Sequence, residues 1–244
     1  MKTSFMRFEK KFILNKIQMQ SMIKGLFSNG FIYDTYAASS NTYPIYTIYY
    51  DTLDRNVLRQ SSNKSAYREK FRLRFYTYPL KDDSIVFLEI KKKLAGKGNK
   101  RRLPLTYLNA MNYLEKKLEP HLIDSNHTQI FKEIDHFLNH NKVFPLTFIS
   151  YQRTALIEDK LQMRITFDSD LSYQNLMNPN ELLDTLMTYK NNDVVIMEIK
   201  SLSNYPLWLT KLLTNHRIYA TNFSKYKKIY ESLHEGEKIT HVTN

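Results

Sequence analysis

The chain has 244 residues, enough for one large domain or two small ones, and its hydrophobic share of 42% can fill a sizeable core. Its 36 Lys and Arg residues exceed its 24 Asp and Glu residues, and the net charge of +12 indicates an acidic partner such as nucleic acid, an anionic membrane or a phosphorylated small molecule. Because the chain has no cysteine, disulfides, thiolate nucleophiles and cysteine-ligated metal sites are excluded.

The first half of the chain predicts antiparallel strands around one amphipathic helix. In residues 5–14, charged and apolar side chains alternate with the period of two that is typical of a strand. An amphipathic helix is expected over 15–29, followed by Gly30, a residue suited to the end of a helix. Further strands are expected at 45–51, 68–78 and 84–94, and a hairpin turn at 95–99 precedes the alternating pair Lys100 and Arg102.

The second half of the chain predicts more helix between its strands. Residues 106–140 are expected to be helical, with an interruption near Pro120. The other expected elements are strands at 146–157, 161–170 and 194–200, an irregular segment at 171–190, and helices at 205–215 and 224–233. The order indicates an α+β fold in which antiparallel strands dominate, as a single domain over 1–233 with a flexible C-terminal tail over 234–244.

Several common signals for location and chemistry are missing from the sequence. The N-terminus lacks the apolar segment of a signal peptide, and no run approaches the roughly 18 apolar residues of a membrane span, so we expect a cytoplasmic protein. There is no Gly-Lys-Ser/Thr phosphate loop, no Gly-x-Gly-x-x-Gly and no Gly-x-Ser-x-Gly motif. Nothing indicates specific recognition of nucleobases, so a specific nucleic acid partner is not expected.

The charged residues at strand spacing are mostly basic, and each strand would have one apolar and one ionic face. Ten are positive and four are negative, a net charge of +6: Arg7, Lys11, Arg72, Arg74, Lys91, Lys100, Arg102, Arg153, Arg164 and Lys200 against Glu9, Glu89, Asp168 and Glu198. A sheet that closes on itself would collect these charges in a basic lumen, where a bound polyanion relieves their repulsion. The alternative is an open antiparallel sheet with a solvated charged face.

Three of these residues indicate specific chemistry. Arg72 and Arg74 lie two residues apart on one predicted strand, so their guanidinium groups could hold adjacent phosphoryl groups; the alternative is a pair on the surface. Glu198 stands among cations and is either a salt-bridge partner or a metal ligand. Magnesium or manganese needs only one or two carboxylates when phosphates complete its coordination.

Eight short motifs follow one another over nearly the whole chain: Arg-Phe-Glu-Lys-Lys-Phe at 7–12, Arg-Leu-Arg at 72–74, Glu-Ile-Lys at 89–91, Lys-Arg-Arg at 100–102, Tyr-Gln-Arg at 151–153, Arg-Ile-Thr-Phe-Asp at 164–168, Glu-Ile-Lys at 198–200 and Phe-Ser-Lys-Tyr at 223–226. In this order they resemble the VTC domain, the polyphosphate polymerase branch of the triphosphate tunnel metalloenzymes. The resemblance implies an eight-stranded antiparallel β-barrel flanked by helices, a tunnel that binds triphosphate or polyphosphate, and a divalent metal, Mn²⁺ or Mg²⁺.

The resemblance also implies roles for individual residues. The positions that match phosphate-binding residues of the family are Arg72, Arg74, Lys91, Lys100, Arg153 and Arg164, and the alternation adds Arg102 and Lys200. Glu198 matches the metal-binding glutamate, with Glu9 as a second candidate, and Lys11 matches a basic residue at the tunnel mouth. Ser224 and Lys225 match the start of the terminal helix, where Ser224 could also be a simple N-cap. The family often has lysine where this chain has Asn222.

The resemblance implies a polyphosphate polymerase that transfers the γ-phosphoryl group of ATP onto a growing polyphosphate chain, with Arg72, Arg74, Glu198 and Lys225 as its catalytic residues. The alternatives are a triphosphatase, which hydrolyses tripolyphosphate or nucleoside triphosphates, and a non-catalytic polyphosphate-binding module. Tunnel hydrolases typically begin Glu-x-Glu-x-Lys, whereas here Arg7 takes the first position, which favours the polymerase. The expected partners are ATP and polyphosphate or triphosphate; a membrane-protein partner, the chain length and the oligomeric state stay open.

Overall fold

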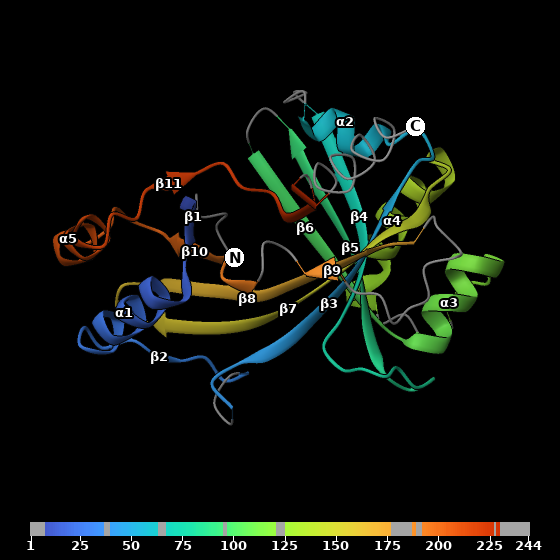
Figure 1. The fold of residues 1–244 in the computed structure, drawn as a ribbon. Coiled ribbons are helices and arrows are strands. Elements are labelled where there is room, and N and C mark those ends of the chain that lie inside the picture. Colours follow the sequence, from blue (N-terminus) through green and yellow to red (C-terminus); the bar gives the residue numbers. More distant parts are fainter. Residues whose placement is uncertain are drawn as a thin grey trace. The chain divides into compact units, whose positions relative to one another are not determined.

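The structure is a computed structural model that describes residues 8–36, 40–62, 67–94, 97–120, 125–176, 187–188, 192–226 and 228–229. The chain divides into two compact units. The first unit consists of 1–44, 150–172 and 187–225, and the second unit consists of 45–149, 173–186 and 226–244. Strands β7 (Phe144–Glu158) and β8 (Met163–Asn175) contribute residues to both units (Figure 1).

The first unit is an antiparallel sheet covered on one face by helices. Its strands follow the order β11-β1-β10-β8-β7, with β1 at Phe8–Leu14, β10 at Val195–Ser201 and β11 at Ala220–Thr221, and the short β2 (Ile32–Tyr33) pairs with β7. The helices are α1 (Lys16–Phe27) and α5 (Leu207–Asn215). Met22 and Leu26 of α1 and Leu209 of α5 join Phe167 and Met197 of the sheet in one buried core. The apolar half of each strand is therefore used to hold the helices.

Helix α1 illustrates how local sequence sets an element's limits. Asn15 accepts a hydrogen bond from the backbone N–H of Gln18, and the Gln18 side chain accepts one from the backbone N–H of Asn15, so a capping box begins the helix. The chain leaves the helix through Gly30, whose φ of +84° favours glycine. Gly25 allows close packing on α5, because a Cβ there would lie 2.6 Å from the side chain of Leu212.

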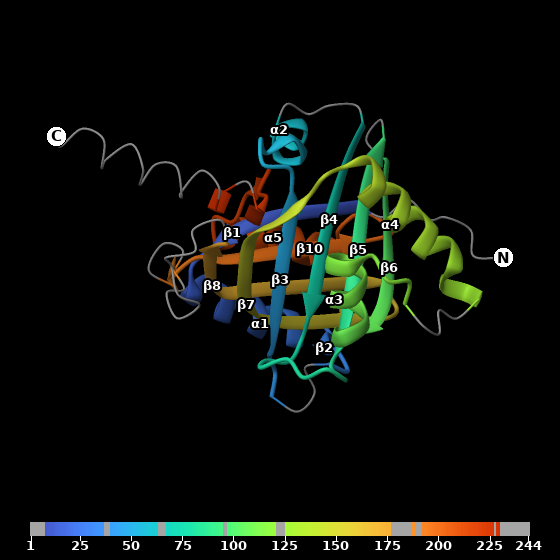
Figure 2. The ribbon, with the colours of Figure 1, turned by 90° about the vertical axis from the view of Figure 1, so that its right-hand side faces the viewer.

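The second unit has a four-stranded antiparallel meander, β3-β4-β5-β6, and its own core. The strands are β3 (Tyr43–Asp51), β4 (Tyr67–Phe75), β5 (Ile85–Leu94) and β6 (Lys97–Thr106), and the helical elements are α2 (Asn56–Ser62), α3 (Tyr107–Lys116), η1 (Ser125–His127) and α4 (Thr128–His140). Figure 2 shows α3 and α4 against the sheet of β4, β5 and β6, and their residues Tyr113 and Phe137 are buried there with Phe71, Leu88 and Leu103.

The fold class predicted from the sequence is confirmed: the protein is α+β, and the pairs β1–β10, β1–β11, β10–β8, β2–β7, β3–β4, β4–β5 and β5–β6 are antiparallel. The closed eight-stranded ring is not seen, because the strand order of the described residues runs from β11 to β6 and no hydrogen-bonded pair joins these two ends. Within the described residues, no helix is both long and apolar enough to cross a membrane.

The predicted and observed elements differ mainly in short elements that were not predicted and in where some strands end. Elements α2, β2 and β11 were not predicted from the sequence. The prediction of an irregular segment at 171–190 is wrong where β8 continues to Asn175 and where β9 forms at Met187–Thr188. The pairing of Leu94 with Lys97 makes the β5–β6 connection shorter than the expected turn at 95–99. The predicted strand residues 5–7, the tail at 234–244 and most of the second half of the helix at 224–233 lie outside the described residues.

Candidate functional site

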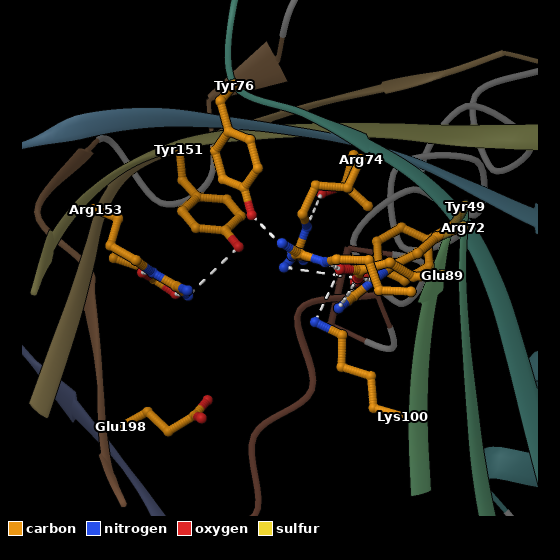
Figure 3. Close-up of polar contacts among 12 residues, drawn as sticks. Tyr49, Arg72, Arg74, Tyr76, Glu89, Lys100, Tyr151, Arg153 and Glu198 are labelled. Atoms are coloured by element: carbon orange, nitrogen blue, oxygen red, sulfur yellow. Dashed lines mark hydrogen bonds and ion pairs between the residues drawn. The ribbon is translucent and has the colours of Figure 1, made fainter. Parts of the chain in front are cut away.

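The second unit gathers basic side chains on the face of its sheet opposite the helices. In β4, the apolar residues Phe71, Leu73 and Phe75 are buried in the core, so the intervening Arg72 and Arg74 belong to the other face. The register brings further charged residues beside them, with Arg72 opposite Glu89 on β5 and Glu89 opposite Arg102 on β6. Because side chains alternate along each strand and the register aligns the strands, charged residues of β4, β5 and β6 form one surface. Figure 3 shows this surface on its right-hand side.

Glu89 is the centre of this surface. Its Oε2 accepts a hydrogen bond from Arg72 Nε at 2.7 Å, and its Oε1 accepts one from Arg102 Nε at 2.6 Å. Lys100 Nζ lies 2.8 Å from Oε1, and Arg74 Nη1 lies 3.8 Å from Oε2. The side chain of Glu89 is only 1% exposed, and although burial raises its pKa, the surrounding Arg72, Arg74 and Lys100 outweigh burial and hold that pKa well below its usual range. We call these five residues the Glu89 cluster.

Aromatic rings orient two guanidinium groups of the Glu89 cluster. Arg72 Nη1 donates to the Tyr49 hydroxyl at 3.1 Å, and Arg102 Nη2 donates to the Tyr76 hydroxyl at 2.9 Å. The Arg102 guanidinium also lies over the ring of Phe87, 4.4 Å from its centroid. Hydrogen bonds and cation–π contacts limit the orientations of these side chains, so their N–H groups have fixed directions before any ligand binds.

Two groups of this surface titrate near pH 8. Burial lowers the pKa of Lys100, and nearby Arg72 lowers it further, so that it falls to about 8 although Glu89 opposes the change. Burial raises the pKa of Tyr49, but the charges of Arg72 and Arg74 outweigh burial and lower it to about 8. The charge of the cluster therefore depends on pH just above neutrality.

In the first unit, a buried carboxylate again holds two of the predicted cations. Arg153 binds Asp168 with two hydrogen bonds, from Nε to Oδ1 at 2.6 Å and from Nη2 to Oδ2 at 2.7 Å, and Lys225 Nζ donates to Asp168 Oδ2. Both cations also lie over the ring of Tyr151, at 5.4 Å and 4.6 Å from its centroid. Asp168 is 1% exposed, so its charge is compensated almost wholly by these two partners (Figure 3 shows Arg153 and Tyr151).

Strands β1 and β10 carry alternating charges in a second part of the first unit. The register places Lys11 opposite Glu198 and Glu9 opposite Lys200. Lys200 Nζ lies 2.6 Å from Glu198 Oε1, whereas Lys11 Nζ lies 3.9 Å from Glu9 Oε1 and donates to the carbonyl oxygen of Phe223 at 3.2 Å. Burial raises the pKa of Glu198, but Lys200 and Lys11 outweigh burial and lower it.

The remaining predicted residues have less enclosed positions. Arg164 Nη2 donates to Asp34 Oδ2 at 2.6 Å and to the Tyr43 hydroxyl at 3.3 Å. Lys91 is exposed on β5. Ser224 directly precedes the helical residues 225–226, as its interpretation as an N-cap predicts. Arg7 lies outside the described residues.

The predicted net charge is distributed unequally between the units. In the second unit, the predicted set has five cations and one acid: Arg72, Arg74, Lys91, Lys100 and Arg102 against Glu89. In the first unit, the described members of that set are four cations and three acids, Lys11, Arg153, Arg164 and Lys200 against Glu9, Asp168 and Glu198, and the additional Lys225 and Asp34 cancel each other. An additional anion is therefore most favoured on the second unit's cluster.

The sequence analysis did not foresee which acids hold the cations. Glu89 and Asp168 were recognised only as strand residues, and Asp34 was not recognised, although each accepts from at least one predicted phosphate-binding arginine. For Glu89, the predicted strands 68–78 and 84–94 indicated that it lies on a strand next to that of Arg72, but not the register that places the two residues opposite each other. No sequence signal relates Asp34 to Arg164, which is 130 positions away.

The acids also determine where a divalent metal fits. The described residues contain no group of three or more His, Asp or Glu side chains arranged as a metal site. Glu9 and Glu198 are diagonal neighbours on paired strands, a separation of about 7–8 Å between Cα atoms, which suits two carboxylates that share an ion with phosphate oxygens. Glu198 and Glu9 therefore fit Mg²⁺ or Mn²⁺ better than a metal that requires three or four protein ligands.

Comparisons with known proteins show what this chain is similar to in fold and in sequence. A provisionally assigned adenylate cyclase from Bacillus halodurans has a similar fold, with a TM-score of 0.55 and 13% identity over 90% of this chain and 94% of that one. Protein PH1819 from Pyrococcus horikoshii matches with a TM-score of 0.44 and 13% identity over 92% of this chain and 99% of that one. No curated protein matches the chain. The VTC domain family matches residues 6–234, nearly the whole chain, and the predicted membership is thereby confirmed: this chain belongs to the VTC domain family.

Proposed function

We propose that the protein is a polyphosphate polymerase, which transfers the γ-phosphoryl group of ATP onto the end of an inorganic polyphosphate chain. The observation that carries the proposal is the Glu89 cluster, where four cations surround one buried carboxylate and leave a net charge of +3. A surface of this kind attracts a linear polyanion, and membership of the VTC domain family supports phosphate chemistry over a general acidic partner.

The proposed role of the basic residues is electrostatic. Phosphoryl transfer depends on positioning and on stabilising the charge of the transferred group, for which oriented N–H donors suffice. Arg72 and Arg102 are oriented by Glu89 and by tyrosine hydroxyls, so they need little rearrangement when phosphate arrives. Arg74, whose Nε donates to the Thr47 hydroxyl at 3.4 Å, would contact the same group or its neighbour along the chain.

Acids of the first unit would hold the divalent ion. Glu198, with Glu9 as its neighbour, would bind Mg²⁺ or Mn²⁺ together with phosphate oxygens. When bound, such an ion neutralises charge on the phosphates of ATP. Lys200 and Lys11 keep Glu198 ionised by lowering its pKa, so its carboxylate is available to a metal at neutral pH. Lys225 and Arg153, which Asp168 orients, are proposed to bind phosphate in the same unit.

The choice between polymerase and hydrolase depends on the nucleophile. A terminal phosphate, whose second pKa is about 6, is already anionic at neutral pH, whereas water needs a base to position or deprotonate it. Arg7 replaces the carboxylate that begins the hydrolase motif, which favours a phosphate nucleophile over water. A cytoplasmic location stays a prediction.

Product analysis tests this proposal. With ATP and Mn²⁺, we expect ADP and a ladder of lengthening polyphosphate on a gel, with little free orthophosphate. Arg7→Glu, which restores Glu-x-Glu-x-Lys at the N-terminus, should shift the products toward orthophosphate. Orthophosphate as the main wild-type product would assign the protein to the triphosphatases. If ATP is not consumed but polyphosphate binds, the protein is a binding module.

Affinity for triphosphate should fall as the pH rises from 7 to 9. Lys100, with a pKa of about 8, loses its positive charge in this range, and Tyr49, also about 8, gains a negative one. Calorimetry should show that the triphosphate affinity of wild type falls about three- to tenfold more over this range than that of the double variant Lys100→Arg with Tyr49→Phe, whose charge stays constant. Titration of triphosphate itself affects both proteins equally. Parallel pH profiles for the two proteins would contradict the prediction.

A further inference from the structure

The charge of Glu89 opposes phosphate binding, because a carboxylate repels the anion that the cations attract. Nevertheless Glu89 is almost completely buried, and its two carboxylate oxygens form ion pairs with Arg72, Arg102 and Lys100. Arg74 Nη1 also lies within 4 Å of Oε2. Each oxygen has two lone-pair directions, and the contacts from Arg72 Nε and Nη2 and from Arg102 Nε and Lys100 Nζ account for four. The carboxylate is therefore fully engaged and has no capacity left for a metal or a proton.

Electrostatics explains why such a group is present. Without it, the four cations of β4 and β6 would lie on both sides of position 89 of β5, partly removed from water, and their mutual repulsion would oppose folding whenever no ligand is bound. With it, the cluster keeps a net charge of +3 and a fixed geometry. The depressed pKa of Glu89 agrees with this, since the carboxylate stays ionised throughout the neutral range.

We propose that Glu89 is an internal counter-ion, which takes the place of phosphate in the unliganded protein, orders the four cations and moderates their affinity so that a phosphate chain can leave. The inference rests on the proposed function in so far as it takes phosphate as the ligand. It assigns Glu89 a positioning role through the cations and not a contact with the reacting atoms.

The same strands provide a matched control on their other face. Glu133 of α4 lies 3.7 Å from Lys92 Nζ on β5 and 3.4 Å from Arg101 Nε on β6. Its environment also combines carboxylates with cations, since Lys92 Nζ lies 3.3 Å from Glu69 Oε1 as well, but these groups belong to the face of the strands that packs against the helices. Glu133→Gln therefore removes an equal charge from the same unit without changing the Glu89 cluster.

The test compares melting temperatures of wild type, Glu89→Gln and Glu133→Gln with and without inorganic triphosphate at low salt. In Glu89→Gln, the unliganded protein should melt at least about 5 °C below wild type, and saturating triphosphate should raise its melting temperature about twice as much as it raises that of wild type. In Glu133→Gln, the rise caused by triphosphate should equal that of wild type. Equal rises in all three proteins would overturn the proposal, because a purely structural role of Glu89 does not alter the response to an anion.

Two further measurements keep the inference testable in every case. If triphosphate does not change the melting temperature even of wild type, the protein does not bind phosphate. The counter-ion role is then tested with salt. NaCl at 0.5 M should raise the melting temperature of Glu89→Gln more than that of wild type, because it screens the uncompensated cations. If Glu89→Gln does not fold, the double variant with Lys100→Gln, which returns the cluster to +3, should fold; failure of the double variant as well would refute the counter-ion role.

Discussion

Replacing Arg72 and Arg74 together with glutamine should abolish triphosphate binding and lower turnover of ATP at least about 100-fold, while the fold is retained. A charge-assisted hydrogen bond to phosphate contributes about 1.5–3 kcal/mol, so two lost guanidinium groups correspond to about 3–6 kcal/mol of binding free energy. The fold survives because Glu89 keeps two of its partners, Arg102 at 2.6 Å and Lys100 at 2.8 Å. Since the loss of two partners of Glu89 is offset in part by relief of the repulsion among the four cations, we expect the free energy of unfolding to fall by less than the roughly 3–5 kcal/mol that removal of one member of a buried ionic group costs.

The control for this prediction removes the same number of charges from the opposite face. Lys92 and Arg101 lie on β5 and β6 beside Glu133, so the double variant Lys92→Gln with Arg101→Gln has the net charge of the first variant but an intact Glu89 cluster. Calorimetric titration with triphosphate should give a nearly wild-type affinity for this control. Equal losses in both double variants would mean that affinity depends on overall charge, and no specific site would remain.

The face on which the cations lie was predictable from the sequence because a strand alternates its side chains strictly. The buried residues Phe71, Leu73 and Leu88 are all apolar and the intervening residues are all charged or aromatic, so the period of two identifies the faces without any knowledge of the partners. Antiparallel pairing was equally accessible, since short connections join β4 to β5 and β5 to β6. These features depend on local sequence, which one chain contains completely.

Register and long-range partners were not predictable in the same way. Glu89 meets Arg72 only because β4 and β5 pair in one particular register, and a shift of two residues would preserve the faces but change every partner. Asp168 binds Lys225, which is 57 positions away in the sequence. Arg164 binds Asp34, and the segment around Asp34 carries no periodic signal. The sequence therefore indicates which side chains face the same way, whereas the ion pairs depend on tertiary structure.

Helix α2 shows a second kind of failure. Residues 56–62 contain only two apolar side chains, Val57 and Leu58, and lack amphipathic periodicity, so no helix was predicted there. The helix is held instead by the buried Asp51, whose carboxylate accepts hydrogen bonds from the backbone N–H groups of Val57 and Leu58 and from the Tyr226 hydroxyl. A distant side chain, Tyr226, thus completes the cap, and local propensity alone could not reveal it.

Changing Asp168 to Asn should be among the most destabilising single substitutions in the first unit. Arg153 and Lys225, whose side chains are only 16% and 15% exposed, would lose the negative charge that both of them contact. Removal of one member of a buried ionic group costs about 3–5 kcal/mol, which in a chain of this size corresponds to a decrease of about 6–20 °C in melting temperature. Thermal unfolding in phosphate-free buffer measures the effect without a competing anion.

Asp170→Asn is the matched control for Asp168→Asn, because it lies on the same strand and pairs with Lys16 at 2.9 Å, with both side chains more than 40% exposed. The φ of +51° at Asp170 suits asparagine as well as aspartate, so this control should cost less than about 1 kcal/mol.

The dependence of the melting temperature on acid pH provides an independent test of the role of Asp168. Burial raises the pKa of Asp168, but Arg153 and Lys225 outweigh it and hold that pKa well below its usual range. The carboxylate therefore stabilises the wild type above about pH 4, where the unfolded chain is ionised, and this contribution is lost as the pH falls toward the folded-state pKa. The difference in melting temperature between wild type and Asp168→Asn should accordingly narrow below pH 4, and a difference that stays constant would show that the ionised carboxylate is not what stabilises the unit.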